Sequence, residues 1–237
     1  MSNSTYTTIT RQSGLMREMR LIANNIANSA TSGFRQEGIV FSEYVKSLDG
    51  APSLSMGQGN ARHTSLEQGG LTQTGGQFDL AIEGEGFFLV ETPAGDRLTR
   101  AGTFSPNAEG DLVTPDGFRV LDAGGAPVFI PPGASDVSIA ADGTISSAGD
   151  PVGQMGVMQP INPQGLVRED GVMFRADEGF EPAESAQILQ GFVENSNVNP
   201  ILQLTRMIEV QRAYELGASF LESEDERMRQ AMRAMSQ

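Results

Sequence analysis

Residues 199–235 read NPILQLTRMIEVQRAYELGASFLESEDERMRQAMRAM, and this stretch predicts one long amphipathic helix near the C-terminus. Asn199 can act as the N-cap, and Pro200 fits the first helical position, because a backbone N–H would have no intrahelical partner there. A heptad rhythm with 3-4 spacing follows. It runs through Met207, Val210, Tyr214, Gly217, Leu221, Glu224, Met228, Ala231 and Met235. Because Gly217 and Glu224 interrupt the apolar positions, the rhythm predicts an imperfect coiled coil.

A second amphipathic helix is predicted near the N-terminus, from about residue 5 to residue 30. Its apolar stripe consists of Leu15, Met19, Ile22 and Ile26, whose spacings of 4, 3 and 4 place them on one face. Gly33 is the predicted stop, because glycine readily takes the left-handed conformation that ends helices.

The middle of the chain differs sharply from its two ends. Residues 52–186 contain 11 of the 12 prolines and carry a net charge of −13, against +1 for residues 1–51 and −2 for residues 187–237. Asp-Gly pairs at 116–117, 142–143 and 170–171 are typical of tight turns. Strand candidates are residues 78–82, 87–90, 111–114, 118–121, 128–130, 137–140, 152–158 and 171–174. Short strands with frequent turns predict a compact antiparallel β domain.

The predicted fold class is therefore α+β. N- and C-terminal α-helices are expected to form a coiled-coil-like stem, and the centre is expected to be an antiparallel all-β domain. The predicted divisions are an N-terminal helical arm at 1–35, an extended connector at 36–70, the central β domain at 71–186 and a C-terminal helical arm at 187–237. The connector is predicted to be extended because it is rich in Ser, Gly and Gln.

Composition argues against several classes of function. The net charge of −14 and the lack of a Lys/Arg run argue against nucleic-acid binding, because neutralising phosphates needs clustered cations. The absence of Cys excludes disulfides, a thiol nucleophile and a Cys-ligated zinc site. His63, the only histidine, has no nucleophile or oxyanion motif beside it, so it is interpreted as a loop residue. No metal or cofactor is predicted, and no apolar run is long enough for a transmembrane helix.

The two apolar stripes need burial, either on each other within one chain or against neighbours in an assembly. Asn24, Asn25 and Asn28 lie beside the N-terminal stripe and favour assembly, because Asn is a poor helix former in solvent but can fix register in an interface. We therefore predict a subunit interface on the two arms. Its candidate residues are Leu15, Met19, Ile22, Asn24, Asn25, Ile26, Asn28, Asn197, Asn199, Met207, Val210, Tyr214, Leu221 and Met228.

Three groups of motifs stand in order along nearly the whole chain. The first is IANNIAN at 22–28, followed by TSGFR at 31–35. The second is TGGQFDLAIEGEGFF at 74–88, followed by LTRAGTF at 98–104, and the third is SNVN at 196–199, followed by MIEVQRAYE at 207–215. Together they resemble the bacterial flagellar basal-body rod and hook protein family. The length of the chain and the sequences of both its ends are similar to those of proximal rod members of the family. The acidic residue that often follows the SNVN motif is absent, and Gln203 and Leu204 stand there instead.

This resemblance implies a non-enzymatic axial subunit of the basal-body rod, polymerising through its terminal helices to form the drive-shaft and the wall of the export channel. The expected partners are other rod subunits and the flagellar type III export apparatus, with no nucleic acid, no small-molecule substrate and no membrane insertion. The expected location is the rod spanning the periplasm, reached without a cleaved signal peptide. The alternatives are another rod or hook subunit or, from a different class, a carbohydrate-binding or glycoside-active β domain with a helical dimerisation stalk, since hydrolysis needs only two placed carboxylates.

Overall fold

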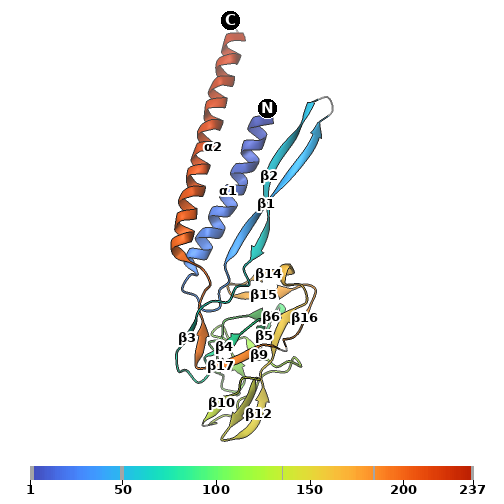
Figure 1. Cartoon of the computed structure of the whole chain (residues 1–237), viewed down its shortest axis with the longest axis vertical. Coiled ribbons are helices and arrows are strands. Elements are labelled where there is room, and N and C mark those ends of the chain that lie inside the picture. Colours follow the sequence, from blue (N-terminus) through green and yellow to red (C-terminus); the bar gives the residue numbers. More distant parts are fainter. Residues whose placement is uncertain (1–2, 49–50, 135, 184, 236–237) are drawn as a thin grey trace. The chain divides into compact units, whose positions relative to one another are not determined.

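The computed structural model describes residues 3–48, 51–134, 136–183 and 185–235, with side chains described at 7–40 and from 63 onwards. It has an α+β fold in which two helices accompany many antiparallel strands, as predicted (Figure 1). The chain divides into two compact units. Unit 1 contains Met1–Ala27, Glu37–Ser65 and Asn199–Gln237, and unit 2 contains Asn28–Gln36 and Leu66–Val198.

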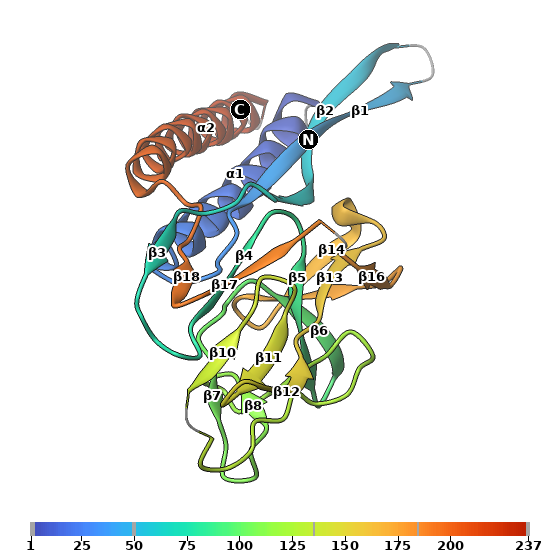
Figure 2. The same cartoon turned by 60° about the horizontal axis from the view of Figure 1, so that its bottom comes forward.

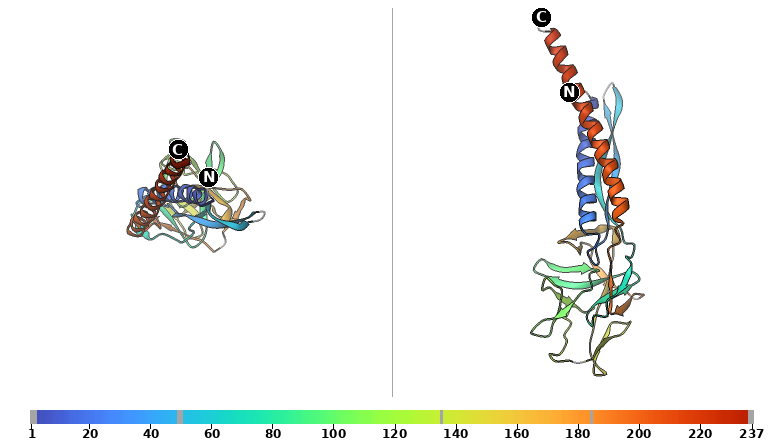
Figure 3. Two further views of the ribbon diagram at one scale, coloured as in Figure 1. Left: turned by 90° about the horizontal axis from the view of Figure 1, so that it is seen from above. Right: turned by 90° about the vertical axis from the view of Figure 1, so that its left-hand side faces the viewer.

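Unit 1 is built from two helices and a hairpin. Helix α1 (Asn3–Ala27) runs antiparallel to helix α2 (Pro200–Met235), since Gln12 lies beside Tyr214 and Asn25 lies beside Gln203. The long hairpin of β1 (Glu37–Leu48) and β2 (Ala51–Thr64) also contacts α1. Figure 3 shows α1, α2 and the hairpin side by side.

The start of α2 agrees with the predicted N-cap, whereas the end of α1 differs from the predicted stop. Asn199 caps α2 as predicted, because its Oδ1 accepts the backbone N–H groups of Ile201 and Leu202 at 3.1 and 3.2 Å. Helix α1 ends at Ala27, before the predicted limit at residue 30, and turns follow it. Gly33, with a φ of +71°, lies in the second of these turns and does not end the helix.

The segment predicted as an extended connector contains the β1–β2 hairpin. Its strands pair antiparallel from Glu37 with Thr64 to Leu48 with Ala51, with register irregularities at two points. The two residues between the strands, Asp49 and Gly50, lie outside the described residues. The hairpin was missed because a segment rich in Ser, Gly and Gln lacks the alternation of apolar and polar residues that is typical of a strand. Backbone hydrogen bonds can pair two strands without that alternation.

Unit 2 is a β structure in which all strand pairs within the described residues are antiparallel. Its largest sheet has nine strands, arranged as β14-β15-β6-β5-β9-β8-β7, with β13 pairing both β5 and β16. These strands are β5 (Phe87–Thr92), β6 (Gly95–Thr99), β7 (Ser105–Pro106), β8 (Leu112–Val113), β9 (Arg119–Leu121), β13 (Val157–Pro160), β14 (Leu166–Glu169), β15 (Met173–Ala176) and β16 (Phe180–Pro182). A short 3-10 turn at Pro163–Gly165 precedes β14.

Smaller sheets complete unit 2. One has three strands, β10 (Val137–Ile139), β11 (Thr144–Ser147) and β12 (Asp150–Gln154), which lie side by side in Figure 2. Strand β4 (Leu80–Glu83) pairs with β17 (Gln187–Gln190), and β3 (Leu71–Gln73) pairs with β18 (Phe192–Glu194). Residues 187–194, which were assigned to the C-terminal helical arm, are thus strands that pair with distant partners.

Strand β5 explains how unit 2 forms its core. Successive residues of a strand point to opposite faces, so the apolar run in β5 supplies two clusters. Phe88 and Val90 belong to the larger cluster with Leu80 and Ile82, and Phe87 belongs to the smaller one. The Phe88 and Phe104 rings meet edge to face at 5.2 Å, which adds a specific packing contact to the apolar burial.

Most of the other predicted strands and turns are also present. Asp170 and Gly171, with φ of 47° and 75°, lie with Val172 in the three-residue turn between β14 and β15. Residues 128–130 form no strand, and Phe129 makes only an isolated bridge to Asp111. The side chains of Val128 and Ile130 are buried although the segment forms no strand. The apolar residues at 128–130 therefore indicated a place in the core and not a strand.

Candidate functional site

The apolar stripes of the two helices pack on each other within unit 1. Leu15, Ile22 and Val210 are buried in one cluster, and five further residues pack against them. These are Met19, Ile26, Met207, Ala213 and Tyr214. Most of the apolar residues predicted for a subunit interface therefore also serve as the core of the α1–α2 pair.

Polar contacts fix the register of this helix pair. The Arg206 guanidinium contacts the buried Glu18 carboxylate at 2.7 Å, and the hydrogen bond raises the pKa of Arg206. The Gln12 Nε2 group donates to the Tyr214 carbonyl at 2.7 Å. The contacting residues are 188 and 202 positions apart in the sequence, so these contacts hold the two ends of the chain together.

Asn25 is almost completely buried, with 1% of its surface exposed. Its Nδ2 donates to the Glu37 carbonyl at 2.7 Å, and its Oδ1 accepts the Glu37 N–H at 3.0 Å, as a second strand would. The same Nδ2 lies 3.3 Å from Gln203 Oε1. Asn25 thus ties α1 to both β1 and α2, and this explains why a poor helix former is tolerated there.

The other predicted asparagines lie in different settings. Asn24 is exposed on α1, and Asn28 Oδ1 accepts the Thr31 hydroxyl at 3.2 Å. In unit 2, Asn197 accepts the Gln36 N–H at 2.6 Å and donates to the Glu67 carbonyl at 2.8 Å. The structure therefore does not bring all the predicted asparagines together into one cluster.

Helix α2 exposes apolar side chains in addition to those in the seam. It is 36 residues long against 25 for α1, and it extends past the N-terminal end of α1 (Figure 1). Leu221 is partly buried, whereas Met228, Met232 and Met235 on this extension are exposed. Exposed apolar residues also lie near the start of α2. These are Ile201, Leu202, Leu204 and Ile208.

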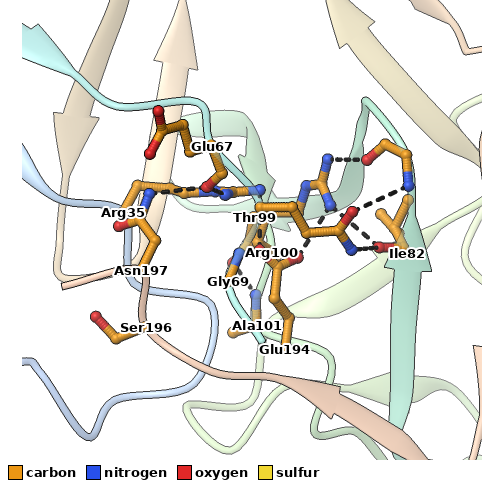
Figure 4. A network of polar contacts seen from close by, with 12 residues as sticks. Arg35, Glu67, Gly69, Ile82, Thr99, Arg100, Ala101, Glu194, Ser196 and Asn197 are labelled. Carbon is orange, nitrogen blue, oxygen red and sulfur yellow. Dashed lines mark hydrogen bonds and ion pairs between the residues drawn. The ribbon is translucent and has the colours of Figure 1, made fainter. Parts of the chain in front are cut away.

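A buried charge cluster in unit 2 was missed by sequence reasoning. Glu194 lies between Arg35 and Arg100, with ion-pair distances of 3.0 and 2.9 Å, and all three side chains are at most 3% exposed (Figure 4). Burial lowers the pKa of both arginines against the opposing effect of Glu194, and that of Arg100 falls to about 10. Both guanidinium groups therefore stay charged at neutral pH.

Backbone groups complete the coordination of this cluster. Arg100 donates to the carbonyls of Ile82 and Gly84 at 3.3 and 2.6 Å, and Arg35 donates to the Glu67 carbonyl. Glu194 Oε1 also accepts the Gly69 N–H at 2.9 Å. The cluster thereby joins five segments of unit 2, at residues 35, 67–69, 82–84, 100 and 194. In the sequence, only the Arg residues inside the motifs TSGFR and LTRAGTF gave a local signal of it.

The described residues contain no group of three or more His, Asp or Glu side chains arranged to hold a metal ion. His63 is exposed. None of the helices in the described part of the chain combines the length and apolar character needed to cross a membrane.

The chain thus combines a terminal helix pair with a β unit that contains a buried charge cluster. Comparison with known proteins indicates the class of protein. A model described as "Flagellar hook protein FlgE/F/G D1 domain" matches residues 81–147, and one described as "Flagellar basal body rod FlgEFG protein C-terminal" matches residues 189–234.

Similar proteins cover nearly the whole chain. The flagellar basal-body rod protein FlgF of Caulobacter vibrioides is 37% identical, over 98% of this chain and 97% of that protein. FlgF of Mesorhizobium japonicum is 38% identical, over 93% and 92% respectively, and the rod protein FlgG of Bacillus subtilis is 30% identical, over 95% and 96%. The chain belongs to the family of flagellar hook and basal-body rod proteins, which is a structural family. These findings favour a structural rod subunit over the carbohydrate-active alternative.

Proposed function

We propose that the chain is an axial subunit of the proximal part of the flagellar basal-body rod. The observation that supports this most directly is the α1–α2 pair, which fills its own seam and still exposes large apolar side chains along α2. Contiguous exposed apolar surface is typical of a protein–protein interaction site. The similarity to FlgF proteins over nearly their full length supports the proximal assignment.

In this proposal the terminal helices form a coiled-coil-like stem through which copies polymerise into the drive-shaft and the wall of the export channel. Leu15, Ile22 and Val210 hold the stem itself together. Asn24 and Met228, which are exposed, are the candidate interface residues that face neighbouring subunits. We propose that the β domain at residues 71–186, together with the strands at 187–194, is a domain separate from the helices α1 and α2 and the β1–β2 hairpin.

The proposed partners are neighbouring rod and hook subunits and the type III export apparatus. Export is proposed to occur without cleavage of a signal peptide, and the rod is proposed to cross the periplasm. The function is proposed to be mechanical rather than enzymatic, with torque carried by packed helices. The net charge of −14 supports solubility of the subunit before assembly.

The test is deletion of the gene, followed by complementation and isolation of basal bodies. We expect the deletion strain to be non-motile with incomplete rods, and the wild-type chain to restore motility and to copurify with basal bodies. A chain carrying Ile22→Asp should fail to do so, because it places a charge in a buried seam. Retained motility in the deletion strain, with the wild-type chain absent from basal bodies, would refute the proposal.

A further inference from the structure

A small cavity in unit 2 lies beside the buried charge cluster. Its volume is about 120 Å³, and both arginines of the cluster, Arg35 and Arg100, line it. We call it the arginine cavity. Every residue that lines it belongs to unit 2, so the cavity is a feature of that unit alone.

Each of the two arginines has one polar group that the cluster does not use. The terminal nitrogens Nη1 and Nη2 of both side chains contact Glu194 or backbone carbonyls. The Nε–H group of each is buried and has no hydrogen-bond partner in the described part of the chain. An unpaired N–H group in the interior is unfavourable, and a guanidinium group can only donate. Both groups are therefore matched by a ligand that supplies acceptors.

The buried charges beside the arginine cavity do not balance. Two guanidinium groups share the single buried carboxylate of Glu194. Glu85 also lines the cavity, but its side chain is exposed, and solvent screens an exposed charge. Burial lowers the pKa of Arg100 to about 10 although Glu194 and Glu85 both act to raise it. A further negative charge in the cavity would therefore be favourable.

The size and the other walls of the arginine cavity restrict the kind of anion. A cavity of about 150 Å³ holds the carbon atoms of a benzene ring, so a volume of about 120 Å³ holds roughly five non-hydrogen atoms. Leu66, Phe87 and Pro160 supply apolar walls, and Cζ of Arg100 lies 5.3 Å from the centroid of the Phe87 ring. A carboxylate on a short hydrocarbon stem fits, because its two oxygens match the two unpaired N–H groups. A phosphate of similar size would have to bury further oxygens against apolar walls.

We propose that the arginine cavity binds a carboxylate group carried on a short aliphatic stem. In the bound state one oxygen accepts the Nε–H of Arg35, the other accepts that of Arg100, and the stem lies against Phe87. The Nε atoms are covered in this structure, so binding includes a small rotation of both guanidinium groups towards the cavity. This inference does not rest on the proposed rod function, because all the residues that it uses lie within unit 2.

An NMR titration of the full-length chain tests the site directly. Propionate is added at neutral pH and constant ionic strength, and the proton–nitrogen correlation signals of the arginine Nε–H groups are followed. We expect the signals of Arg35 and Arg100 to shift together and to saturate, while sulfate and chloride shift neither. Signals that stay unchanged throughout the titration would overturn the proposal. An equal response to sulfate would also overturn it, because the apolar walls would then not select a carboxylate.

A matched pair of variants separates this site from the general effect of surface charge. Glu85→Gln removes the exposed carboxylate that lines the cavity, so propionate should bind about two- to fivefold more tightly. Glu109→Gln makes the same chemical change at an exposed residue of unit 2 that does not line the cavity, and the affinity should stay at the wild-type value. Both chains should fold, since both side chains are exposed. Equal affinities of the two variants would overturn the proposal.

Two probes distinguish the sources of such a carboxylate. Propionate represents a free small acid, and a glutamate with both backbone ends blocked represents an acidic side chain of a protein segment. Tighter binding of the blocked glutamate would assign the site to a protein side chain, and a response to propionate alone would assign it to a free acid; either result supports the carboxylate site. A blocked glutamine should shift neither Nε–H signal, and an equal response to it would overturn the requirement for a negative charge.

Discussion

Glu194→Gln removes the carboxylate that two buried guanidinium groups contact, while it preserves the size of the side chain. Arg35 and Arg100 would stay buried without the anion that they share, and the pKa of Arg100, about 10 with Glu194 in place, would fall further. Breaking a buried ion pair by removing one partner costs about 3–5 kcal/mol. Both arginines keep backbone carbonyl acceptors, so we expect a loss near the lower end, about 3 kcal/mol.

Thermal unfolding followed by far-UV circular dichroism measures this loss. For a chain of this length, 1 kcal/mol shifts the melting temperature by about 2–4 °C, so the transition of unit 2 should fall by about 6–12 °C. Glu83→Gln is the matched control, since it makes the same chemical change at an exposed position of β4. A Glu194→Gln chain that melts together with this control would refute the argument that the cluster stabilises unit 2.

The pH dependence of the same variant gives an independent check. Burial makes the folded chain release the Arg100 proton more readily than the unfolded chain does, so its titration raises stability only as pH rises above about 10. Because Glu194 raises the pKa of Arg100 against burial, that pKa should be lower in Glu194→Gln, and the stability of the variant should begin to rise at a lower pH than that of the wild type. The difference in melting temperature between the two chains should therefore narrow as pH approaches about 10 from below, and a difference that stays constant up to that pH would contradict this.

Three further predictions follow from individual residues. Asn25→Ala should cost about 1–3 kcal/mol, because it removes the two hydrogen bonds that the buried Asn25 side chain makes to the backbone of Glu37; hydrogen exchange at β1 should then rise, and unchanged exchange would contradict this. Gly33→Ala should destabilise unit 2 by more than about 1–3 kcal/mol, because φ is +71° and the added Cβ would lie 2.2 Å from a backbone nitrogen; an unchanged melting temperature would count against it. Hydrogen bonds from the backbone and side chain of Thr144 lower the pKa of the Asp142 carboxyl, so the stabilisation they give is present at neutral pH and is lost as pH falls through that lowered value. A carboxyl titration by NMR at or above the ordinary Asp value would contradict this last prediction.

Local signals were enough for the helices and for part of the β unit. The capped start of α2 and the apolar run of β5 are encoded in consecutive residues, and both formed where they were predicted. The β1–β2 hairpin was not recognised, because backbone pairing holds it while its composition is typical of a loop. Residues 187–194 became strands because β4 and β3 supply their partners, which no local pattern reveals.

The candidate site was only partly accessible from the sequence for a similar reason. The stripes of both helices were recognised, but their periodicity does not say whether a stripe packs on its own chain or on a neighbour. Glu194, Arg35 and Arg100 come together only in the folded unit, and no spacing connects them. Ile201, Leu204 and Ile208 fall outside the predicted heptad rhythm of α2, and their exposure becomes visible only in the folded chain.

The polar contacts between α1 and α2 also have a kinetic consequence. Gln12 and Tyr214 are 202 positions apart, and Glu18 and Arg206 are 188 apart, so the first helix to be synthesised meets its partner only when almost the last residues are available. Such contacts close very large loops, and contacts of high sequence separation slow folding. In the proposed export, a chain threaded end-first through a narrow passage would not complete its helix pair until both ends had emerged on the same side. The order of the sequence would then delay pairing of α1 with α2 until the whole chain had passed.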